Sequence, residues 1–103
     1  MASTLAVTEG EVVSEHREDR EEVVVHWRPG CPYCMKLRLQ LRFTGLPYTE
    51  VNIWKDREAA AYVRSVADGN ETVPTVRVAG TALVNPSLRQ LLKAVSAHAP
   101  HLL

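Results

Sequence analysis

Short apolar runs rich in β-branched residues alternate with longer segments of helical periodicity from residue 23 onward. The runs Val23–Trp27 and Tyr48–Ile53 predict two strands. Two more runs, Val76–Ala79 and Ala82–Val84, flank Gly80-Thr81 and predict a β-hairpin with its turn at these two residues. The last two expected strands are therefore neighbours in an antiparallel pair.

The first expected helix follows the first strand. It begins at Pro32, because proline is favoured in the first turn of a helix, and it ends before Gly45 and Pro47. Its apolar residues recur at helical spacing and predict a broad buried face made of Cys34, Leu37, Leu39, Leu41 and Phe43.

Two more helices complete the pattern. Asp56 is expected to cap a helix that runs through Ala67 and stops at Gly69. The last helix is expected to begin with a cap at Asn85, directly before Pro86. Its core positions follow the i, i+3, i+4, i+7 spacing and are Leu88, Leu91, Leu92 and Val95.

The resulting order of elements is β-α-β-α-β-β-α. The first two strands are joined by a helix and should lie parallel, whereas the last two form the antiparallel hairpin. This order predicts an α/β domain built on a four-stranded mixed sheet with helices on both faces.

Length and charge divide the chain into two parts. Its 103 residues, 46% of them apolar, provide enough core for one compact domain. The formal net charge of zero conceals an acidic segment, residues 1–22, with a charge of −5, while residues 23–103 carry +5. We expect residues 1–22 to form a solvated, disordered extension, with a transient contact between extension and body as the alternative.

No apolar run is long. The longest cover about five residues, as at Ala59–Val63, whereas a membrane-spanning helix needs roughly 20. The first basic residue is Arg17 and no long apolar segment precedes it, so a secretory signal is not expected. These features favour a cytoplasmic protein. We expect a monomer whose partners include neither a membrane nor a nucleic acid.

The candidate chemistry lies in Cys31-Pro32-Tyr33-Cys34, which holds the only two cysteines of the chain. The pair falls where the first strand gives way to the first helix, and the unpaired N–H groups at a helix start stabilise a thiolate. Cys31 is therefore the expected nucleophile. Cys34, one turn further on, is the expected resolving thiol that closes a Cys31–Cys34 disulfide.

A structural zinc site is the alternative interpretation of two cysteines at this spacing. Zinc normally takes four protein ligands, and the further candidates are only His16, His26, His98 and His101. His16 lies in the acidic segment, and His98 and His101 follow the last helix, so each of these three is expected at the surface. No metal site is predicted.

Two motifs in this order resemble the glutaredoxins of the thioredoxin-like superfamily. The first is Cys31-Pro32-Tyr33-Cys34, and the second is Thr72-Val73-Pro74-Thr75-Val76, similar to the TVP segment of that family. The resemblance implies the thioredoxin-like, glutaredoxin-type fold and a cis peptide bond before Pro74. It also implies that Pro74 faces Cys31 and that the Val73 backbone pairs with substrate. The position of Tyr33 within the dithiol motif makes it either a wall for the bound thiol or a surface aromatic residue that fills the turn.

The stretch after the TVP segment departs from the glutathione-using members. These usually have a Gly-Gly pair and then an acid that hold the glutamyl end of glutathione, whereas this chain has Val84-Asn85-Pro86-Ser87-Leu88. Together with the TVP segment, this stretch is similar to the mycoredoxins, the glutaredoxin-like proteins that act on mycothiol. Asn85 and Ser87 are therefore candidates for thiol binding, although for Asn85 the helix cap is the first expectation and thiol binding the second.

Three further residues bear on the site. Arg28 lies three residues before Cys31 and is expected to stabilise the thiolate or meet an acceptor on the substrate, or else to be a solvated charge at the strand end. Trp27 lies where glutaredoxins usually have a small residue, and Gly30 replaces the threonine or tryptophan that often precedes the first cysteine.

These features predict a thiol-disulfide oxidoreductase that reduces mixed disulfides on proteins. The electron source is expected to be a low-molecular-weight thiol, mycothiol before glutathione, acting as a co-substrate without a bound cofactor. One alternative is an electron donor to ribonucleotide reductase that is itself reduced by thioredoxin reductase. The other is a non-catalytic glutaredoxin that binds an iron-sulfur cluster or metal, against which the presence of Cys34 argues.

Overall fold

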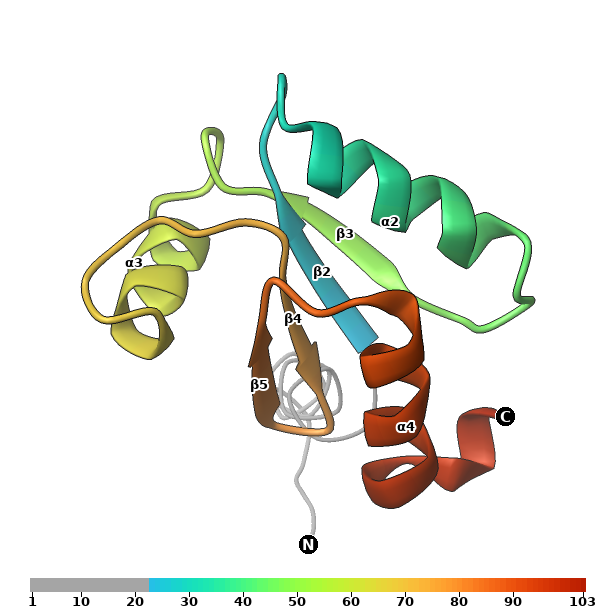
Figure 1. The fold of residues 1–103 in the computed structure, drawn as a ribbon. Coiled ribbons are helices and arrows are strands. Elements are labelled where there is room, and N and C mark those ends of the chain that lie inside the picture. Colours follow the sequence, from blue (N-terminus) through green and yellow to red (C-terminus); the bar gives the residue numbers. More distant parts are fainter. Residues whose placement is uncertain (1–22) are drawn as a thin grey trace, which may run out of the picture.

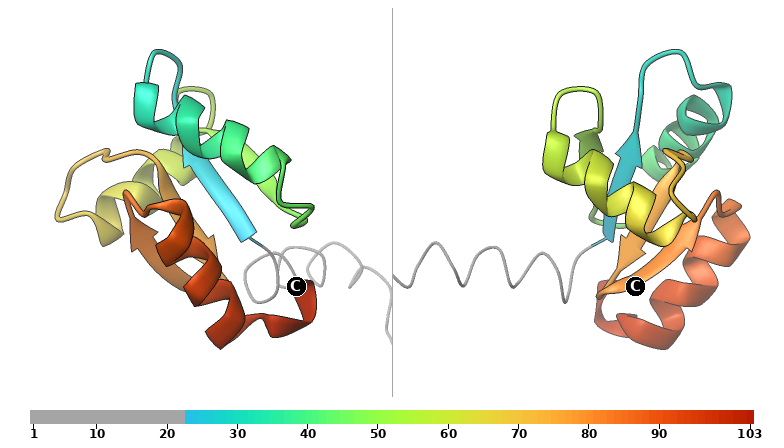
Figure 2. Two further views of the ribbon diagram at one scale, coloured as in Figure 1. Left: turned by 45° about the vertical axis from the view of Figure 1, so that its right-hand side comes forward. Right: turned by 90° about the vertical axis from the view of Figure 1, so that its left-hand side faces the viewer.

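A computed structural model describes residues 23–103, and the acidic segment 1–22 lies outside the described residues. Within them, four strands form one mixed sheet in the order β3-β2-β4-β5. Helices α2 and α4 cover one face of this sheet and α3 covers the other (Figures 1 and 2). The predicted order of elements and the thioredoxin-like fold are confirmed.

The strand pairing follows from the connections. β2 (Val23–Trp27) pairs parallel with β3 (Thr49–Asn52), because α2 carries the chain back to the same end of the sheet. β4 (Thr75–Val78) pairs antiparallel with β2 on its other side and with β5 (Thr81–Val84). The sheet thus places the end of β2, which leads to the cysteines, beside the start of β4.

The hairpin turn lies one residue earlier than its predicted position at Gly80-Thr81. The two turn residues are Ala79 and Gly80, with φ values of 49° and 89°, and Thr81 pairs with Val78. Two successive positive φ angles give a turn whose twist matches that of the flanking strands, and Ala79 adopts a conformation that residues with a Cβ rarely take. The predicted strand at Tyr48 also begins one residue later, at Thr49, and ends at Asn52.

Helix α2 (Pro32–Arg42) begins at the predicted proline, but its buried face is narrower than predicted. Leu37 and Leu41 are buried, whereas Leu39 is 54% exposed and Phe43 is 84% exposed. Two residues along a helix correspond to a rotation of about 200°, so Leu39 and Phe43 point away from the sheet. The prediction that they belong to the core is wrong.

Helix α3 (Arg57–Val66) has the predicted cap, since the Asp56 carboxylate accepts a hydrogen bond from the Ala59 N–H at 3.0 Å. It ends one residue before the predicted Ala67. Helix α4 (Leu88–His98) includes His98, which was expected beyond its end, and is followed by the short 3-10 helix η1 (Pro100–Leu102).

Asn85 is not the cap of α4, contrary to the prediction. The cap is Ser87, whose hydroxyl accepts from the Gln90 N–H at 3.1 Å. A capping residue has extended backbone angles, whereas Asn85 has a φ of 52°. The Asn85 N–H instead donates to the Pro74 carbonyl at 2.8 Å, which joins the β5–α4 loop to the start of β4.

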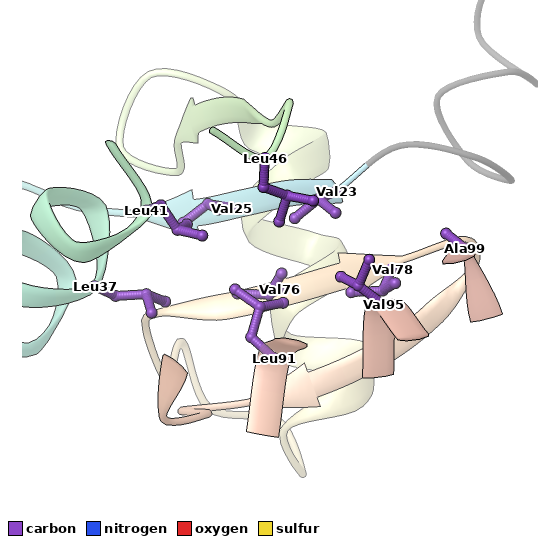
Figure 3. Close-up of a cluster of buried hydrophobic side chains, with 10 residues drawn as sticks. All are labelled: Val23, Val25, Leu37, Leu41, Leu46, Val76, Val78, Leu91, Val95 and Ala99. Carbon is purple, nitrogen blue, oxygen red and sulfur yellow. The ribbon is translucent and has the colours of Figure 1, made fainter. Parts of the chain in front are cut away.

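Two apolar clusters stabilise the sheet, one on each face. The larger lies between the sheet and helices α2 and α4. There, every second residue of β2 and β4 points toward the leucines of the two helices (Figure 3). Its fully buried members include Val25, Val76, Leu41 and Leu91. The smaller cluster packs α3 against the two cysteines and Val73. No helix among residues 23–103 is long and apolar enough to cross a membrane.

Candidate active site

The two cysteines lie at the junction between β2 and α2. Gly30, directly before them, has a φ of 79°, a conformation that is strained for any residue with a side chain. This explains why glycine stands there in place of the threonine or tryptophan of many glutaredoxins. Cys31 then caps α2, and its Sγ accepts a hydrogen bond from the Cys34 N–H at 3.2 Å. The helix start thus directs an N–H group at the sulfur of Cys31.

Both thiols are free and buried. Cys31 is 4% exposed and Cys34 is completely buried, so the difference in exposure between nucleophile and resolving thiol is smaller than their positions in the helix suggest. The Cys31 thiol donates to the carbonyl oxygen of Val73 at 3.7 Å. The TVP segment therefore lies directly beside the sulfur of Cys31.

The environments of the two sulfurs differ more in chemistry than in exposure. Burial, together with the hydrogen bond to Cys31, raises the pKa of the Cys34 thiol to about 12. Cys34 consequently stays protonated near neutral pH. The sulfur of Cys31 is the one that receives the helix N–H group, so the two thiols differ in their hydrogen bonding and in their ease of ionisation.

The TVP segment is held beside Cys31 by its own hydrogen bonds. The peptide bond between Val73 and Pro74 is cis, as the resemblance implies. The Thr75 hydroxyl donates to the Thr72 carbonyl at 2.7 Å across this bond. Val73, in the same apolar cluster as the two cysteines, presents its carbonyl oxygen to Cys31.

His26 supports this segment, a role that the sequence did not indicate. Its Nδ1 lies 3.0 Å from the carbonyl oxygen of Thr75, and its ring packs against Tyr62 with 5.0 Å between the centroids. Burial is the main effect that lowers the pKa of His26, so the ring is neutral and Nδ1–H is the donor. The histidine thus joins the end of β2 to the residue that follows Pro74.

The other histidines lie elsewhere. His98 and His101 are exposed near the C-terminal end, and His16 lies outside the described residues. Residues 23–103 contain no cluster of three or more His, Cys, Asp or Glu side chains that could hold a metal ion.

Two tryptophans flank the β2–α2 junction. The Arg28 guanidinium lies 5.8 Å from the ring centre of Trp54, an exposed residue that the sequence did not mark. Trp27 packs against the cluster of the cysteines, and the Arg38 guanidinium stacks over its ring at 3.8 Å. Arg38 also donates to both carboxylate oxygens of Glu50 at 3.0 Å. The Trp27 ring is thus covered by the Arg38 guanidinium, which the Glu50 carboxylate holds in place.

A groove of about 290 Å³ runs from the dithiol motif to the start of α4. It brings together three residues predicted for thiol binding: Tyr33, Asn85 and Ser87. The predicted residues Arg28, Thr72, Val73 and Pro74 do not line it. The α2 wall of the groove also includes Lys36 and Gln40, which the sequence did not mark because they resemble ordinary solvent-facing helix residues.

The start of α4, at one end of this groove, is closed by its own side chains. The Ser87 hydroxyl accepts from the Gln90 N–H, and the Gln90 side-chain oxygen accepts from the Ser87 N–H at 2.9 Å. This reciprocal pair is a capping box. It uses two of the backbone donors that would otherwise face an anion at the helix N-terminus.

Comparisons with known proteins show the family to which this chain belongs. The family model described as Glutaredoxin matches residues 23–84. Mycoredoxin 1 of Corynebacterium glutamicum is 37% identical over 76 residues, which cover 73% of this chain and 94% of that protein. A Mycobacterium tuberculosis protein with a provisional glutaredoxin name is 48% identical over 58 residues, which cover 55% of this chain and 69% of that protein.

Solved structures share the fold. A crystal structure of a thioredoxin-like protein has a TM-score of 0.62 at 24% identity and covers 70% of this chain and 97% of its own. The solution structure of reduced glutaredoxin C1 from Populus tremula x tremuloides has a TM-score of 0.56 at 20% identity and covers 85% of this chain and 77% of its own. At these identities the likeness extends to the fold alone.

Proposed function

Because this chain belongs to the glutaredoxin family and is a glutaredoxin-like disulfide oxidoreductase, we propose that it reduces mixed disulfides between proteins and mycothiol. The proposed nucleophile is Cys31 and the proposed resolving thiol is Cys34. The choice of mycothiol rests on the capping box of Ser87 and Gln90, which occupies two backbone N–H groups at the N-terminus of α4.

In the first step, the Cys31 thiolate attacks the mycothiol sulfur of the mixed disulfide. A bond forms between Cys31 and mycothiol while the original disulfide breaks, and the protein leaves as a thiolate that takes up a proton. A second mycothiol, as thiolate, then attacks the sulfur of the bound mycothiol. This step forms the symmetrical disulfide of mycothiol, which a separate reductase must reduce, and it returns Cys31 as a thiolate.

A protein disulfide requires the second cysteine. Cys31 first forms a mixed disulfide with the protein, and Cys34 then loses its proton and attacks the sulfur of Cys31. The Cys31–Cys34 disulfide forms and the second protein thiol is released. Because burial raises the pKa of the Cys34 thiol and keeps it protonated near neutral pH, we propose that this route is slower than the first unless a base accepts the proton.

The capping box argues against glutathione. In glutathione-using members, a Gly-Gly pair and an acid hold the glutamyl end at the position of residues 84–88. Here the Gln90 amide and the Ser87 hydroxyl satisfy each other, and no acid is present in this stretch. Mycothiol has no carboxylate and does not need these donors, whereas glutathione would lose a charge-assisted contact there.

The TVP segment and the loop before Cys31 supply the remaining proposed contacts. We assign the Val73 backbone to pairing with the substrate as an added strand, with Thr72 and Pro74 shaping that edge. Arg28, three residues before Cys31 and with its guanidinium 5.8 Å from the ring centre of Trp54, would meet an acceptor on the substrate. Tyr33, Asn85 and Ser87 would contact the small thiol along the groove.

The cellular setting follows from the chemistry. A dithiol that must be reduced after each cycle favours a reducing compartment, and we propose the cytoplasm. The partners would be thiol-modified or disulfide-containing proteins, with the mycothiol system as the electron source. We further propose that residues 23–103 are the catalytic domain, that residues 1–22 are an acidic extension, and that the protein acts as a monomer.

Parallel turnover assays test this function. One test protein with a single cysteine would be loaded with either mycothiol or glutathione, and each reaction would be coupled to the reductase of its own thiol. A third reaction would supply only thioredoxin reductase. We expect turnover of the mycothiol mixed disulfide to be about 10- to 150-fold faster than that of its glutathione counterpart, the effect of one lost charged contact. Equal rates, or efficient turnover with thioredoxin reductase alone, would contradict the choice of mycothiol.

A further inference from the structure

Helix α2 carries an apolar stripe on its exposed side. The stripe consists of Met35, Leu39 and Phe43, which are 52%, 54% and 84% exposed. Spacings of four residues place the three side chains in line along one side of the helix. A single exposed apolar residue is ordinary, whereas several in line form a surface that suits a partner.

A hollow lies beside the stripe, between α2 and the start of β3. It is made of two cavities of about 260 and 510 Å³ that share Arg38, Arg42 and Glu50 as lining residues. Two residues of the stripe line the smaller cavity and Tyr48 lines the larger one. This α2–β3 hollow therefore combines apolar and charged walls.

The α2–β3 hollow has an excess of positive charge. Arg38 donates to both carboxylate oxygens of Glu50 at 3.0 Å, so these two charges compensate each other. Arg42 is exposed, and within residues 23–103 the ion pairs join only Arg38 to Glu50 and Arg64 to Glu71. Arg42 thus has no carboxylate partner among these residues. A segment with both acidic and apolar side chains would complement the hollow.

The acidic segment, residues 1–22, has this composition. It carries a charge of −5, whereas the rest of the chain carries +5. Its stretch Glu11-Val12-Val13-Ser14-Glu15 places two valines between two carboxylates. A second copy of the basic body complements the hollow less well, because it would bring like charges together.

The acidic segment also joins the body beside the hollow. β2 begins at Val23, and the parallel pairing of Val24 with Thr49 places Val23 next to Tyr48 at the same end of the sheet. Glu15 lies eight residues before Val23, at most about 29 Å along an extended chain. A short covalent connection gives such a segment an effective concentration on the order of millimolar at a nearby surface.

We infer that the acidic segment docks on the α2–β3 hollow, with its two valines against Met35 and Leu39 and its carboxylates at Arg42. Each exposed ion pair contributes little, so the contact is transient and weakens as salt screens the charges. The docked segment covers apolar surface of the helix that begins at the dithiol.

The test follows the acidic segment in the full chain by nuclear magnetic resonance. The backbone amide resonances of Val12 and Val13 are recorded at about 0.01 M and about 1 M salt, where the Debye length is about 30 Å and about 3 Å. We expect them to differ between the two conditions. Arg42→Glu should lower the docking equilibrium constant about 2- to 30-fold, the effect of two exposed ion pairs, and move the low-salt resonances toward their high-salt positions.

Arg89→Glu is the matched control, because Arg89 is an exposed residue of α4 that does not line the hollow and its substitution changes the charge equally. It should leave the resonances of the two valines at their wild-type positions. The ε-methyl group of Met35 reports from the opposite side of the contact. Its low-salt resonance should move toward the high-salt position in the double variant Glu11→Gln, Glu15→Gln.

Three results would overturn the inference. The first is valine resonances at low salt that are the same in the wild-type protein and in Arg42→Glu, or that shift equally in both arginine variants. The second is a Met35 methyl resonance that does not move in the double variant. The third is a shift that appears only as the protein concentration rises, which would assign the hollow to a second copy of the chain.

Discussion

Replacing Cys34 with serine should separate the two reactions of the dithiol. Cys34 is completely buried, and its surroundings raise the pKa of its thiol from 9.0 to about 12. At any pH well below 9, this difference lowers the thiolate population about 1,000-fold relative to an ordinary thiol. The serine hydroxyl is similar in size and cannot resolve a disulfide, so Cys34→Ser removes the internal route while leaving the cap of α2 at Cys31.

We expect Cys34→Ser to retain turnover of mixed disulfides, because an external thiol attacks there without the help of Cys34. Reduction of protein disulfides should fall to the background rate. In the wild-type protein, the internal step requires the Cys34 thiolate. Burial, the largest cause of the raised Cys34 pKa, persists when Cys31 carries a mixed disulfide, so the rate should still rise with pH beyond pH 9.

The measurement is stopped-flow release of a fluorescent thiol from a mixed disulfide at Cys31, between about pH 6 and pH 10. The wild-type trace reports internal resolution, and Cys34→Ser supplies the background without it. Cys31→Ser cannot form this mixed disulfide; in steady-state assays it is the second control and should turn over neither mixed disulfides nor protein disulfides. A wild-type rate that levels off below about pH 9 would refute the reasoning, because Cys34 would then ionise as an ordinary thiol.

Three further predictions concern stability. Ser87→Ala should lower Tm by about 4–8 °C in a thermal melt, because loss of a helix cap costs about 1 kcal/mol; an unchanged Tm would remove the capping box. Burial lowers the pKa of His26, so the unfolded chain binds its proton more readily; the free energy of unfolding should fall below about pH 6.5, and less so in His26→Phe, as denaturant titrations would report. Deleting residues 1–22 should change Tm by less than about 5 °C, and a larger loss would place that segment inside the fold.

Local signals in the sequence determined the order of elements and the position of the dithiol. Pro32 begins α2 and Asp56 caps α3, and each acts on backbone groups within one helical turn. Leu91 and Val95 recur at helical spacing and are both fully buried. Interactions of this range depend on neighbours along the chain, so they can be predicted from the order of residues.

Periodicity alone overestimated the core of α2. A leucine or phenylalanine on a helix can lie on any side, and only the placement of α2 against the sheet decided that Leu37 is buried while Leu39 and Phe43 are exposed. The cap of α4 was ambiguous for a similar reason. Asn85 and Ser87 are both good capping residues, and the bond from the Asn85 N–H to the distant Pro74 carbonyl decided between them.

The functional site depends even more on tertiary structure. The cysteine and TVP motifs could be recognised along the chain, but Lys36 and Gln40 carry no sequence signal that distinguishes them from other helix surface residues. They line a groove only because α4 begins beside α2, with the β5–α4 loop between. Likewise, His26 supports the TVP segment because β2 pairs with β4, which brings its ring to the Thr75 carbonyl. The sequence by itself thus determined which groups can react, whereas contacts between distant segments decided their burial, their protonation and the surface offered to a substrate, since all three depend on neighbours in space.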